Sequence, residues 1–217
     1  MFLNRAEAGN LLANELTDYI NNDDVVIMAI PRGGVPIGYT ISKKLHLPLE
    51  IVLSKKIGHP YNKEYAIGAV TLKSKILSDA AYEVSDVYIE EETKRIRKLL
   101  KKRQTLYYGD KKPMKLKNKR VILVDDGVAT GNTVISCIHL IEKHDPDKII
   151  IALPVAPPSA IKSIKEISDI ENVICLHEPR NFSAVGQFYQ YFDQVNDQEV
   201  IQLLKDANKN LSLDLVC

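Results

Sequence analysis

The sequence predicts an α/β protein built on a parallel β-sheet with helices on both faces. Short, continuous apolar runs, such as VVIMAI from Val25 and VILV from Val121, are typical of strands buried on both faces. Segments in which apolar residues recur at helical spacing separate these runs. The resulting strand-helix-strand pattern occurs once in each half of the chain, which favours a parallel sheet over an antiparallel one.

The first half of the chain opens with leucines near helical spacing and a polar turn, NNDD. The first strand is expected at Val25–Ile30. It is followed by the segment PRGG (Pro31–Gly34) and by a helix over VPIGYTISKKL. The segment LEIVLSK from Leu49 is rich in branched residues, and we expect it to form the second buried strand.

A stretch of different character separates the two halves. The segment Ala66–Asp79 predicts a hairpin, and a long helix is expected from about Asp86, with acidic residues at its start and basic residues near its end. From Lys94 to Arg120 the chain carries thirteen basic residues and one acidic residue, Asp110. This stretch is interpreted either as a solvated helix face with a linker or as a mobile basic arm near an anionic substrate. We expect residues 57–118 to form a flexible loop or arm inserted in the domain.

The second half repeats the alternation. VILV (Val121–Val124) is expected to be a strand, and a glycine turn leads from it into a helix that continues through Cys137–Lys143. KIIIALPV from Lys148 and NVICL from Asn172 are expected strands, with a helix at Ser159–Ser168 between them. The whole chain, residues 1–217, is therefore interpreted as one domain.

Composition and charge argue against several classes of protein. With 45% hydrophobic and 26% charged residues, the 217-residue chain is long enough to bury the core of one domain. Lys and Arg total 29 against 28 Asp and Glu, so no overall field favours a nucleic-acid or membrane partner. Three separated cysteines without a C-x-x-C motif favour a reducing compartment. No stretch approaches about 18 consecutive apolar residues, and we expect a soluble cytoplasmic protein.

The segment VILVDDGVATGNT (Val121–Thr133) carries the side chains with the clearest chemistry. Asp125 and Asp126 follow the strand directly, at the carboxyl edge where parallel sheets bind ligands. The glycine turn that enters the helix presents backbone N–H groups, and Thr130 and Thr133 add hydroxyl donors, which together suit a phosphate monoester. The two carboxylates would repel that phosphate unless they faced sugar hydroxyls or Mg²⁺. The segment therefore predicts a site for a phosphorylated sugar.

Other phosphate-binding loops do not fit this sequence. It contains no G-x-x-x-x-G-K-[ST] motif and no G-x-G-x-x-G after a strand, which argues against nucleotide triphosphatases and dinucleotide-binding enzymes. The structural alternative for Asp125 and Asp126 is an Asx turn at the end of a strand. Two acids, two glycines and two threonines within so short a segment favour a ligand site over a turn alone.

Val121–Thr133 resembles the motif of type I phosphoribosyltransferases that binds 5-phosphoribosyl-1-pyrophosphate (PRPP), in which a pair of acids precedes a loop of small residues. The resemblance implies a Rossmann-like α/β fold with a small hood and a flexible-loop region, and it implies Mg²⁺ bound together with PRPP. Asp125 and Asp126 would be catalytic, holding the ribose hydroxyls and contacting the metal indirectly through PRPP. The other residues of the PRPP site would be Gly127, Val128, Ala129, Thr130, Gly131, Asn132 and Thr133, of which Val128–Thr133 would wrap the 5-phosphate.

The segment PRGG resembles the pyrophosphate loop of the same family, where the backbone approaches the ligand closely and glycine permits unusual torsions. Arg32 is then a candidate catalytic contact to the diphosphate. The Lys55-Lys56 pair, expected at the end of the second strand, is similar to a basic pair that reaches the pyrophosphate in several of these enzymes, and Lys56 is the preferred catalytic residue. An ordinary glycine turn and solvated lysines are the alternatives. The expected pyrophosphate site comprises Pro31, Arg32, Gly33, Gly34, Lys55 and Lys56.

One departure from the family pattern concerns the acceptor, the base that would receive the phosphoribosyl group. Hypoxanthine and guanine enzymes of the family carry an acid just before the Thr-Gly of the motif, where this chain has Ala129. The resemblance therefore disfavours a 6-oxopurine acceptor. His59 and Glu64 are candidates for acid-base chemistry, and surface loop residues are the alternative interpretation of both.

The C-terminal segment 177–217 is expected to form a hood over the site. Its aromatic residues suggest a platform on which a planar base could stack, with core packing as the alternative. The tentative base-binding residues are Phe182, Phe188 and Tyr189. The histidines His139, His144 and His177 lack metal-ligand spacing and are interpreted as structural or surface residues.

The expected function is transfer of the 5-phosphoribosyl group from PRPP to a nitrogenous base, with release of pyrophosphate. The overall pattern resembles a group of bacterial phosphoribosyltransferases whose substrate is not settled. The alternatives are a non-catalytic PRPP-binding regulator that could bind RNA and another phosphosugar-processing enzyme. The expected partners are PRPP and a small base, without nucleic acid or membrane, and a homodimer is left open.

Overall fold

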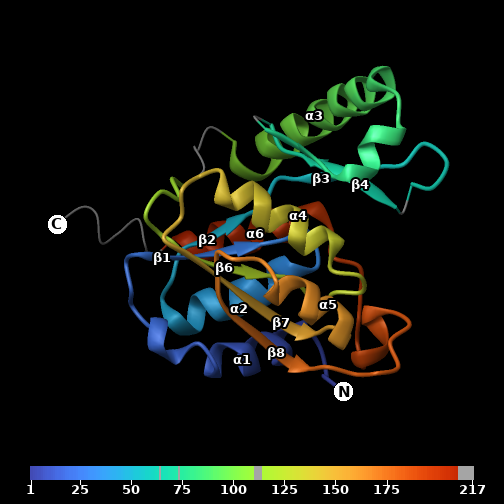
Figure 1. The fold of residues 1–217 in the computed structure, drawn as a ribbon. Helices are drawn as coiled ribbons and strands as arrows, with labels where there is room; N and C mark the ends of the chain where they lie inside the picture. The colour runs from blue at the N-terminus through green and yellow to red at the C-terminus, as the bar shows by residue number, and fades with distance from the viewer. Residues whose placement is uncertain (64, 73, 110–113, 210–217) are drawn as a thin grey trace.

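The computed structural model describes residues 1–63, 65–72, 74–109 and 114–209, and its centre is a five-stranded parallel sheet (Figure 1). Each of its strand pairs is parallel. In spatial order the strands are β2 (Leu49–Ile51), β1 (Val25–Ala29), β6 (Arg120–Val124), β7 (Lys148–Val155) and β8 (Ile170–His177).

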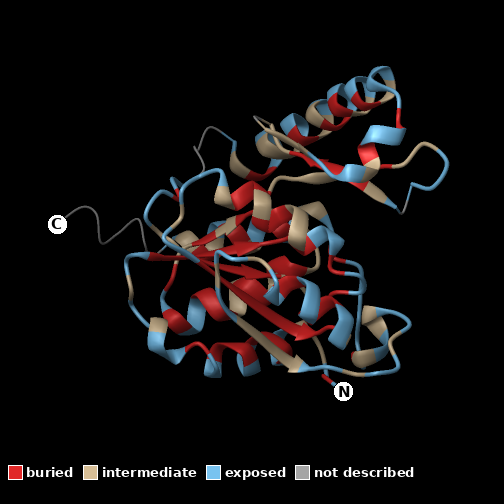
Figure 2. Ribbon diagram, viewed as in Figure 1, coloured by how far each residue is buried: buried red, intermediate tan, exposed pale blue. Residues whose placement is uncertain are grey.

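Helices cover both faces of this sheet. One face carries α1 (Arg5–Asn14), α2 (Gly34–Leu45) and α6 (Asp197–Asn208). The other carries α4 (Asn132–Glu142) and α5 (Pro158–Lys165). In Figure 2 most of the sheet is buried, while the helices bury one side and expose the other. The predicted fold class, a parallel sheet between two layers of helices, is confirmed.

Alternation along each strand divides the core into two layers. Val25 and Ile27 of β1 join the cluster under α1 and α2, whereas Val26 and Met28 join the cluster under α4. All five residues of β1 are buried, as a strand covered on both faces requires. Full burial of such a side chain contributes about 1.5–3 kcal/mol, so these apolar runs are a main source of the sheet's stability.

A second module forms from the middle of the chain. It contains an antiparallel sheet of β3 (Lys55–Gly58), β4 (Ala66–Val70) and β5 (Lys75–Leu77), then the 3₁₀ helix η2 (Asp79–Glu83) and the long helix α3 (Asp86–Tyr108). It has its own small core, in which Ile57 and Ile67 pack against Ile96 and Leu100 of α3. The predicted hairpin and long helix are confirmed. Separation of residues 57–118 as a flexible insertion stays a prediction.

The second strand predicted from Leu49 is present as β2, but its predicted extent over the run LEIVLSK is wrong. β2 ends at Ile51, and after a short link the chain begins β3 in the other sheet. The Val52 N–H donates to Ala29 O, which keeps the chain beside β1, but Lys55 and Lys56 pair with β4. The run is continuous in sequence because both sheets bury branched residues, so composition does not mark the point where the chain leaves one sheet for the other.

The N-terminus is tied to the segment that precedes α6. The Phe2 N–H donates to Phe188 O, and the Gln190 N–H donates to Phe2 O, so the two segments form a short bridge. The segment before α6 includes the 3₁₀ helix η3 (Val185–Phe188). A further 3₁₀ helix, η1 (Thr17–Tyr19), follows α1. Residues 188–193, called the hood strip below, therefore lie against the start of the chain.

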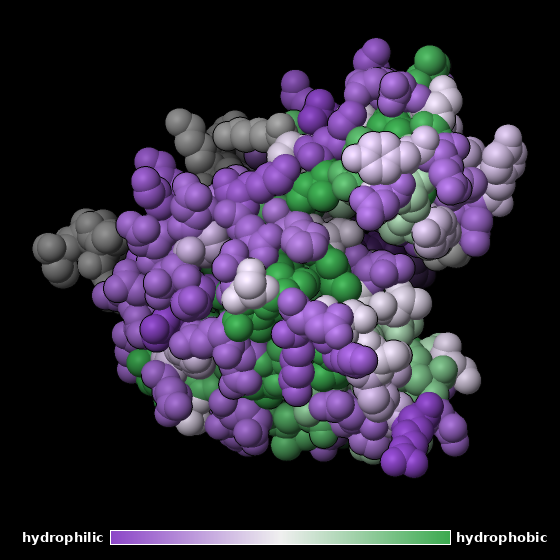
Figure 3. Space-filling model, viewed as in Figure 1, coloured by the Kyte–Doolittle hydropathy of each residue, from purple (hydrophilic) through white to green (hydrophobic). Residues whose placement is uncertain are grey.

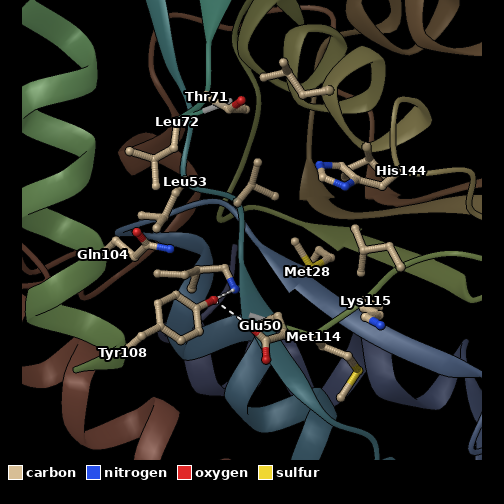
Figure 4. A pocket seen from close by; sticks show the side chains of 15 residues that line it. Met28, Glu50, Leu53, Thr71, Leu72, Gln104, Tyr108, Met114, Lys115 and His144 are labelled. Atoms are coloured by element: carbon tan, nitrogen blue, oxygen red, sulfur yellow. Dashed lines mark hydrogen bonds between the residues drawn. The ribbon is translucent and has the colours of Figure 1, made fainter. Parts of the chain in front are cut away.

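A cavity of about 550 Å³ lies between α3, α4 and the β1–β2 side of the sheet (Figure 4). Its walls are mainly apolar, and the Tyr108 hydroxyl donates to Glu50 Oε2 (2.5 Å) among the side chains that line it. The described residues around it include none of the predicted site residues. The side of the molecule seen in Figure 3 is largely hydrophilic, with apolar residues gathered near its centre. No helix in the described part of the chain is long and apolar enough to span a membrane.

Candidate active site

The topology brings the two predicted ligand loops together. β1 and β6 are neighbours, and the chain moves from β1 towards β2 but from β6 towards β7, so the strand order reverses between them. Ligands of open parallel sheets bind at such a switch point, outside the carboxyl ends of the strands. The Ile30 N–H donates to Val124 O (2.9 Å), which places the start of PRGG beside the start of the acidic loop.

Gly33 and Gly34 allow these loops to touch. A Cβ atom on Gly33 would lie 2.0 Å from Asp126 Oδ2, and one on Gly34 would lie 2.8 Å from Val124 O. This close approach is one of loop to loop, and an approach of the PRGG backbone to the diphosphate stays a prediction. The expected unusual torsion is absent at Gly33, which has φ −60° and ψ −35° in the ordinary helical region. The peptide bond that joins Pro31 to Arg32 is cis.

The acidic pair is held by the polypeptide on several sides. The Asp126 N–H donates to Asp125 Oδ1 (2.9 Å), and the Tyr189 hydroxyl donates to Asp126 O (2.6 Å). Burial raises the pKa of the Asp125 carboxyl above its ordinary range, and the charge of Asp126 raises it further. Burial raises the pKa of the Tyr189 hydroxyl as well, so it stays a hydrogen-bond donor at neutral pH.

Arg5, at the start of α1, supplies the cation for this pair. Its Nε and Nη2 both donate to Asp126 Oδ2, at 2.9 and 2.7 Å, and its Nη1 donates to Asp193 O (2.8 Å). The two side chains are only 12% and 14% exposed. The Arg5 guanidinium also lies 3.9 Å from the centre of the Phe192 ring. Sequence reasoning missed Arg5, because 121 residues separate it from Asp126 and no local motif marks it.

The loop after the acids leads into the N-terminus of α4, where the 5-phosphate is predicted to bind, and is called the cradle below. Gly131 caps α4 with φ +83°, a left-handed conformation that disfavours a side chain. Gly127 is also confined, because a Cβ atom there would lie 2.6 Å from Val185 Cγ1. Val128 is buried, and its N–H donates to Val155 O. The exposed residues at the mouth of the cradle are Ala129, Thr130, Asn132 and Thr133.

Arg32 projects from the PRGG loop towards α6. Its Nη1 lies 3.7 Å from Asp197 Oδ1, and the Tyr107 hydroxyl donates to the same oxygen (2.5 Å). Burial is the main cause that raises the pKa of Tyr107 to about 12, and the hydrogen bond to Asp197 is the second. This cluster joins α3, α6 and the PRGG loop. Its members are far apart in sequence, so Asp197 and Tyr107 were not predicted.

Lys55 and Lys56 are the first residues of β3 and do not end a strand of the large sheet as predicted. They pair with Val70 and Ala69 of β4, and both are half-buried. The link before them is anchored on α4, where Ser54 Oγ lies 3.2 Å from Cys137 Sγ. A contact from either lysine to pyrophosphate stays a prediction.

The aromatic residues of the C-terminal segment divide into two groups. The Phe182 and Phe188 rings lie 5.2 Å apart, and His177 meets Phe188 edge-on at 5.4 Å. These rings are half-buried or exposed, and their role in base binding stays a prediction. Tyr189 is 5% exposed and packs against Phe2, so core packing accounts for its ring.

The loop after β3 holds the two acid-base candidates. The His59 ring lies 5.8 Å from the Tyr61 ring and 6.2 Å from the Tyr65 ring. Glu64 lies outside the described residues. The Lys63 ammonium donates to the Tyr88 hydroxyl, which donates in turn to Gly58 O, and this chain of bonds fastens the loop to α3.

The donor set at the site fits a metal that arrives with its ligand. Within the described ranges no cluster of three His, Cys, Asp or Glu side chains could hold an ion. Asp126 Oδ2 is already engaged by Arg5, which leaves Asp125 as the main carboxylate near the cradle. Mg²⁺ commonly takes one or two carboxylates together with substrate phosphates, and the residues present suit that arrangement better than a site made by protein alone.

The sequence matches a family model described as "Phosphoribosyl transferase domain" over residues 3–188. A curated protein of Mycobacterium tuberculosis H37Rv, provisionally named a phosphoribosyl transferase, is 29% identical over 218 residues. That match covers 98% of this chain and 48% of the relative, so the chain spans about half the length of the curated relatives it matches there. A uracil phosphoribosyltransferase of Ureaplasma parvum is 32% identical over 60 residues, 28% of this chain and 29% of that protein.

Among solved structures, the crystal structure of TT1426 from Thermus thermophilus is similar over nearly its whole length. The TM-score is 0.83 at 34% identity, and the match covers 94% of this chain and 98% of that one. Because the family match runs from residue 3 to residue 188 and includes both loops at the switch point, this chain belongs to the phosphoribosyl transferase family.

Proposed function

We propose that the protein transfers the 5-phosphoribosyl group of PRPP to a nitrogenous base and releases pyrophosphate. One observation carries the proposal: the acidic loop and PRGG meet at the topological switch point of the sheet. An anion cradle, a carboxylate and a second loop with an arginine are thereby placed within one region. PRPP has a phosphate, two ribose hydroxyls and a diphosphate in a matching order.

The donor would lie across both loops. Val128–Thr133 and the start of α4 would hold the 5-phosphate, with the backbone N–H groups of residues 129–133 and the hydroxyls of Thr130 and Thr133 as donors. The Val128 N–H donates to Val155 O and would support the loop. The acidic pair would face the ribose. Arg32 and the backbone of PRGG would contact the diphosphate, and Lys56 is proposed to approach it from β3.

In the reaction the bond from C1 of the ribose to the pyrophosphate oxygen breaks, a bond from C1 to a base nitrogen forms, and the proton on that nitrogen passes to the leaving pyrophosphate or to water. The bonding electron pair leaves with pyrophosphate, and positive charge develops on the ribose ring in the transition state. Arg32 would stabilise the leaving group, and the acidic pair would stabilise the ring. Mg²⁺ bound with PRPP would neutralise further charge on the diphosphate.

The acceptor would enter from the side of the C-terminal segment. Phe182 and Phe188 offer adjacent rings on which a planar base could stack. Ala129 is exposed in the cradle and lacks the acid that 6-oxopurine enzymes of the family carry at this position. We therefore propose a base other than hypoxanthine or guanine.

The donor assignment is tested with Asp125→Asn and Asp126→Asn, singly and together. The double variant is expected to lower PRPP affinity by at least about tenfold, since each lost charged hydrogen bond is worth about that factor. Titration calorimetry in Mg²⁺ measures it. Asp147→Asn is the control, because Asp147 is an exposed acid beside Arg120 at the amino-terminal ends of the strands, away from the acidic pair. Unchanged PRPP affinity in the double variant would refute the assignment.

The acceptor is tested with a panel of free bases incubated with PRPP and Mg²⁺, reading pyrophosphate release. We expect turnover with at least one base and none with hypoxanthine or guanine. Tight PRPP binding without turnover of any base would favour a regulator.

A regulator that binds RNA is the second candidate, and one feature of the structure favours it. The outer face of α3 exposes Lys94, Lys98, Lys101 and Lys102 at helical spacing. Such a face suits a phosphate backbone. If it binds RNA, the affinity should fall steeply with salt. RNA binding that is independent of salt, or absent, would remove this candidate.

A further inference from the structure

We infer that Arg5 is a positioning residue for the acidic pair: it fixes the Asp126 carboxylate and joins the hood strip to the PRPP loop. The inference rests on the proposed function and deepens it, because it assigns to the N-terminal helix a part in binding the ribose of the donor. Its basis is a set of contacts among Arg5, Asp126 and the hood strip, residues 188–193.

Every nitrogen of the Arg5 guanidinium has an acceptor. Nε and Nη2 converge on Asp126 Oδ2, and Nη1 reaches Asp193 O. A planar guanidinium can make these bonds in one orientation, which a lysine ammonium cannot reproduce. Phe192 covers one face of the group, so the interaction is shielded from water and is stronger than a surface ion pair.

The backbone around Arg5 is fixed before the side chain is considered. Asn4 caps α1 by accepting from the Glu7 N–H, and Phe2 and Leu3 exchange backbone bonds with the hood strip. Arg5 therefore leaves the first turn of α1 at a set place. Its side chain points at the acidic loop because α1 begins beside the hood strip.

The position of Asp126 is then determined from four directions. Arg5 holds Oδ2, Tyr189 holds the backbone oxygen, the Asp126 N–H bonds to Asp125, and the backbone of Gly33 lies against the carboxylate. With Oδ2 fixed, the rotation of the carboxylate is fixed, and so is the direction of its second oxygen. Arg5 also offsets the negative charge of Asp126 next to a proposed phosphate site, where that charge would otherwise repel the ligand.

A merely structural role for Arg5 makes a different prediction. If Arg5 only tied the N-terminus to the hood strip, its loss would lower thermal stability and the fraction of active protein, while the KM for PRPP would stay the same. A positioning role predicts that the KM and the Kd for PRPP rise in protein that is still folded. The two roles are therefore separated by the split between KM and kcat.

The experiment compares the wild type with Arg5→Met, Arg5→Lys and the control Arg120→Met. Arg120 is the first residue of β6 and pairs with Asp147 at the amino-terminal end of the strands, away from the candidate site. PRPP affinity is measured by calorimetry, kcat and KM by pyrophosphate release, and folding by circular dichroism. Arg5→Met is expected to weaken PRPP binding about 10- to 100-fold, as for loss of a charged hydrogen-bond pair, and to change the KM for the base less than twofold. Arg5→Lys should recover part of the loss, and Arg120→Met should bind PRPP with the affinity of the wild type.

A double-mutant cycle with Asp126→Asn tests whether Arg5 acts through that carboxylate. The double variant Arg5→Met with Asp126→Asn should bind PRPP no more weakly than Asp126→Asn alone. Additive losses, or an Arg5→Met protein with wild-type PRPP affinity, would overturn the inference. If Arg5→Met does not fold, Arg5→Lys carries the same comparison. A wild-type protein that does not bind PRPP would instead refute the proposed function, so the two failures are distinct.

Discussion

Gly33 illustrates how one missing side chain makes the site. Its backbone torsions are ordinary, so any residue could adopt them, but the Asp126 carboxylate occupies the space where a Cβ atom would stand. Gly109 is the opposite case. It has φ +56°, and no atom lies within 4 Å of the position that a Cβ atom would take, so only its torsion favours glycine.

Gly33→Ala should therefore displace Asp126 and lower PRPP affinity by at least about tenfold, if the cost is near that of a lost charged hydrogen bond. Calorimetry measures the affinity. Gly109→Ala is the matched control: the backbone there (φ +56°, ψ −121°) is one that residues with a Cβ atom rarely adopt, so the change should cost about 1–3 kcal/mol of stability and leave PRPP affinity unchanged. Equal PRPP affinity in Gly33→Ala and the wild type would contradict the steric argument.

At the scale of elements, α3 is fastened to the edge of the large sheet by its last residue. The Tyr108 hydroxyl accepts from the Ile51 N–H (3.2 Å) of the edge strand β2 and donates to Glu50 Oε2 (2.5 Å), as the dashed lines in Figure 4 show. Burial is the main cause that raises the pKa of this hydroxyl, and the negative charge of Glu50 raises it further. One side chain thus satisfies an edge amide and attaches the small module to the sheet.

Tyr108→Phe should lower the free energy of unfolding by about 1–3 kcal/mol, because it removes a partner from two polar groups that stay in place. Urea denaturation followed by circular dichroism measures the change. Tyr82→Phe is the control, since Tyr82 is 90% exposed, and it should be neutral. Identical urea midpoints for Tyr108→Phe and the wild type would show that the hydroxyl does not stabilise the contact between α3 and β2.

For the whole molecule, burial of weak acids predicts a loss of stability in alkali. Burial raises the pKa of the Cys137 thiol from 9.0 to about 12, and burial with the Asp197 bond raises that of Tyr107 from 10.0 to about 12. The unfolded chain then loses these protons at a lower pH than the folded protein does. The stability that depends on these protonated groups is fully present below about pH 9 and declines from there towards pH 12.

The urea midpoint should thus be constant from pH 7 to 8.5 and fall progressively at pH 9.5 and 10.5. Cys137→Ala should make this decline shallower, because it removes one of the contributing groups. Cys137 lies against Ser54 Oγ, so the variant is compared with its own midpoint at pH 7.5 to correct for lost packing. A midpoint that does not change up to pH 10.5 would contradict the assignment of buried, neutral groups.

The sequence by itself determined the class of fold, most elements and the position of the two loops that are predicted to bind the ligand. These depend on local properties: apolar runs for buried strands such as Val25–Ile30, helical spacing, and the acid-glycine-threonine order of Val121–Thr133. It also correctly indicated the hairpin at Ala66–Asp79. The division of the run after Leu49 between two sheets was missed, because both destinations select the same branched residues.

Only the tertiary structure decided how these loops are completed. It placed PRGG against the acids through the β1–β6 neighbourhood, put Arg5 on Asp126 and Asp197 beside Arg32, and buried Tyr189 under the acidic loop. Each of these relations joins residues far apart in the chain. Their side chains carry no local pattern, since an arginine in the first turn of a helix has the same sequence context whether it faces solvent or a carboxylate. The partner is fixed by the packing of helices on the sheet.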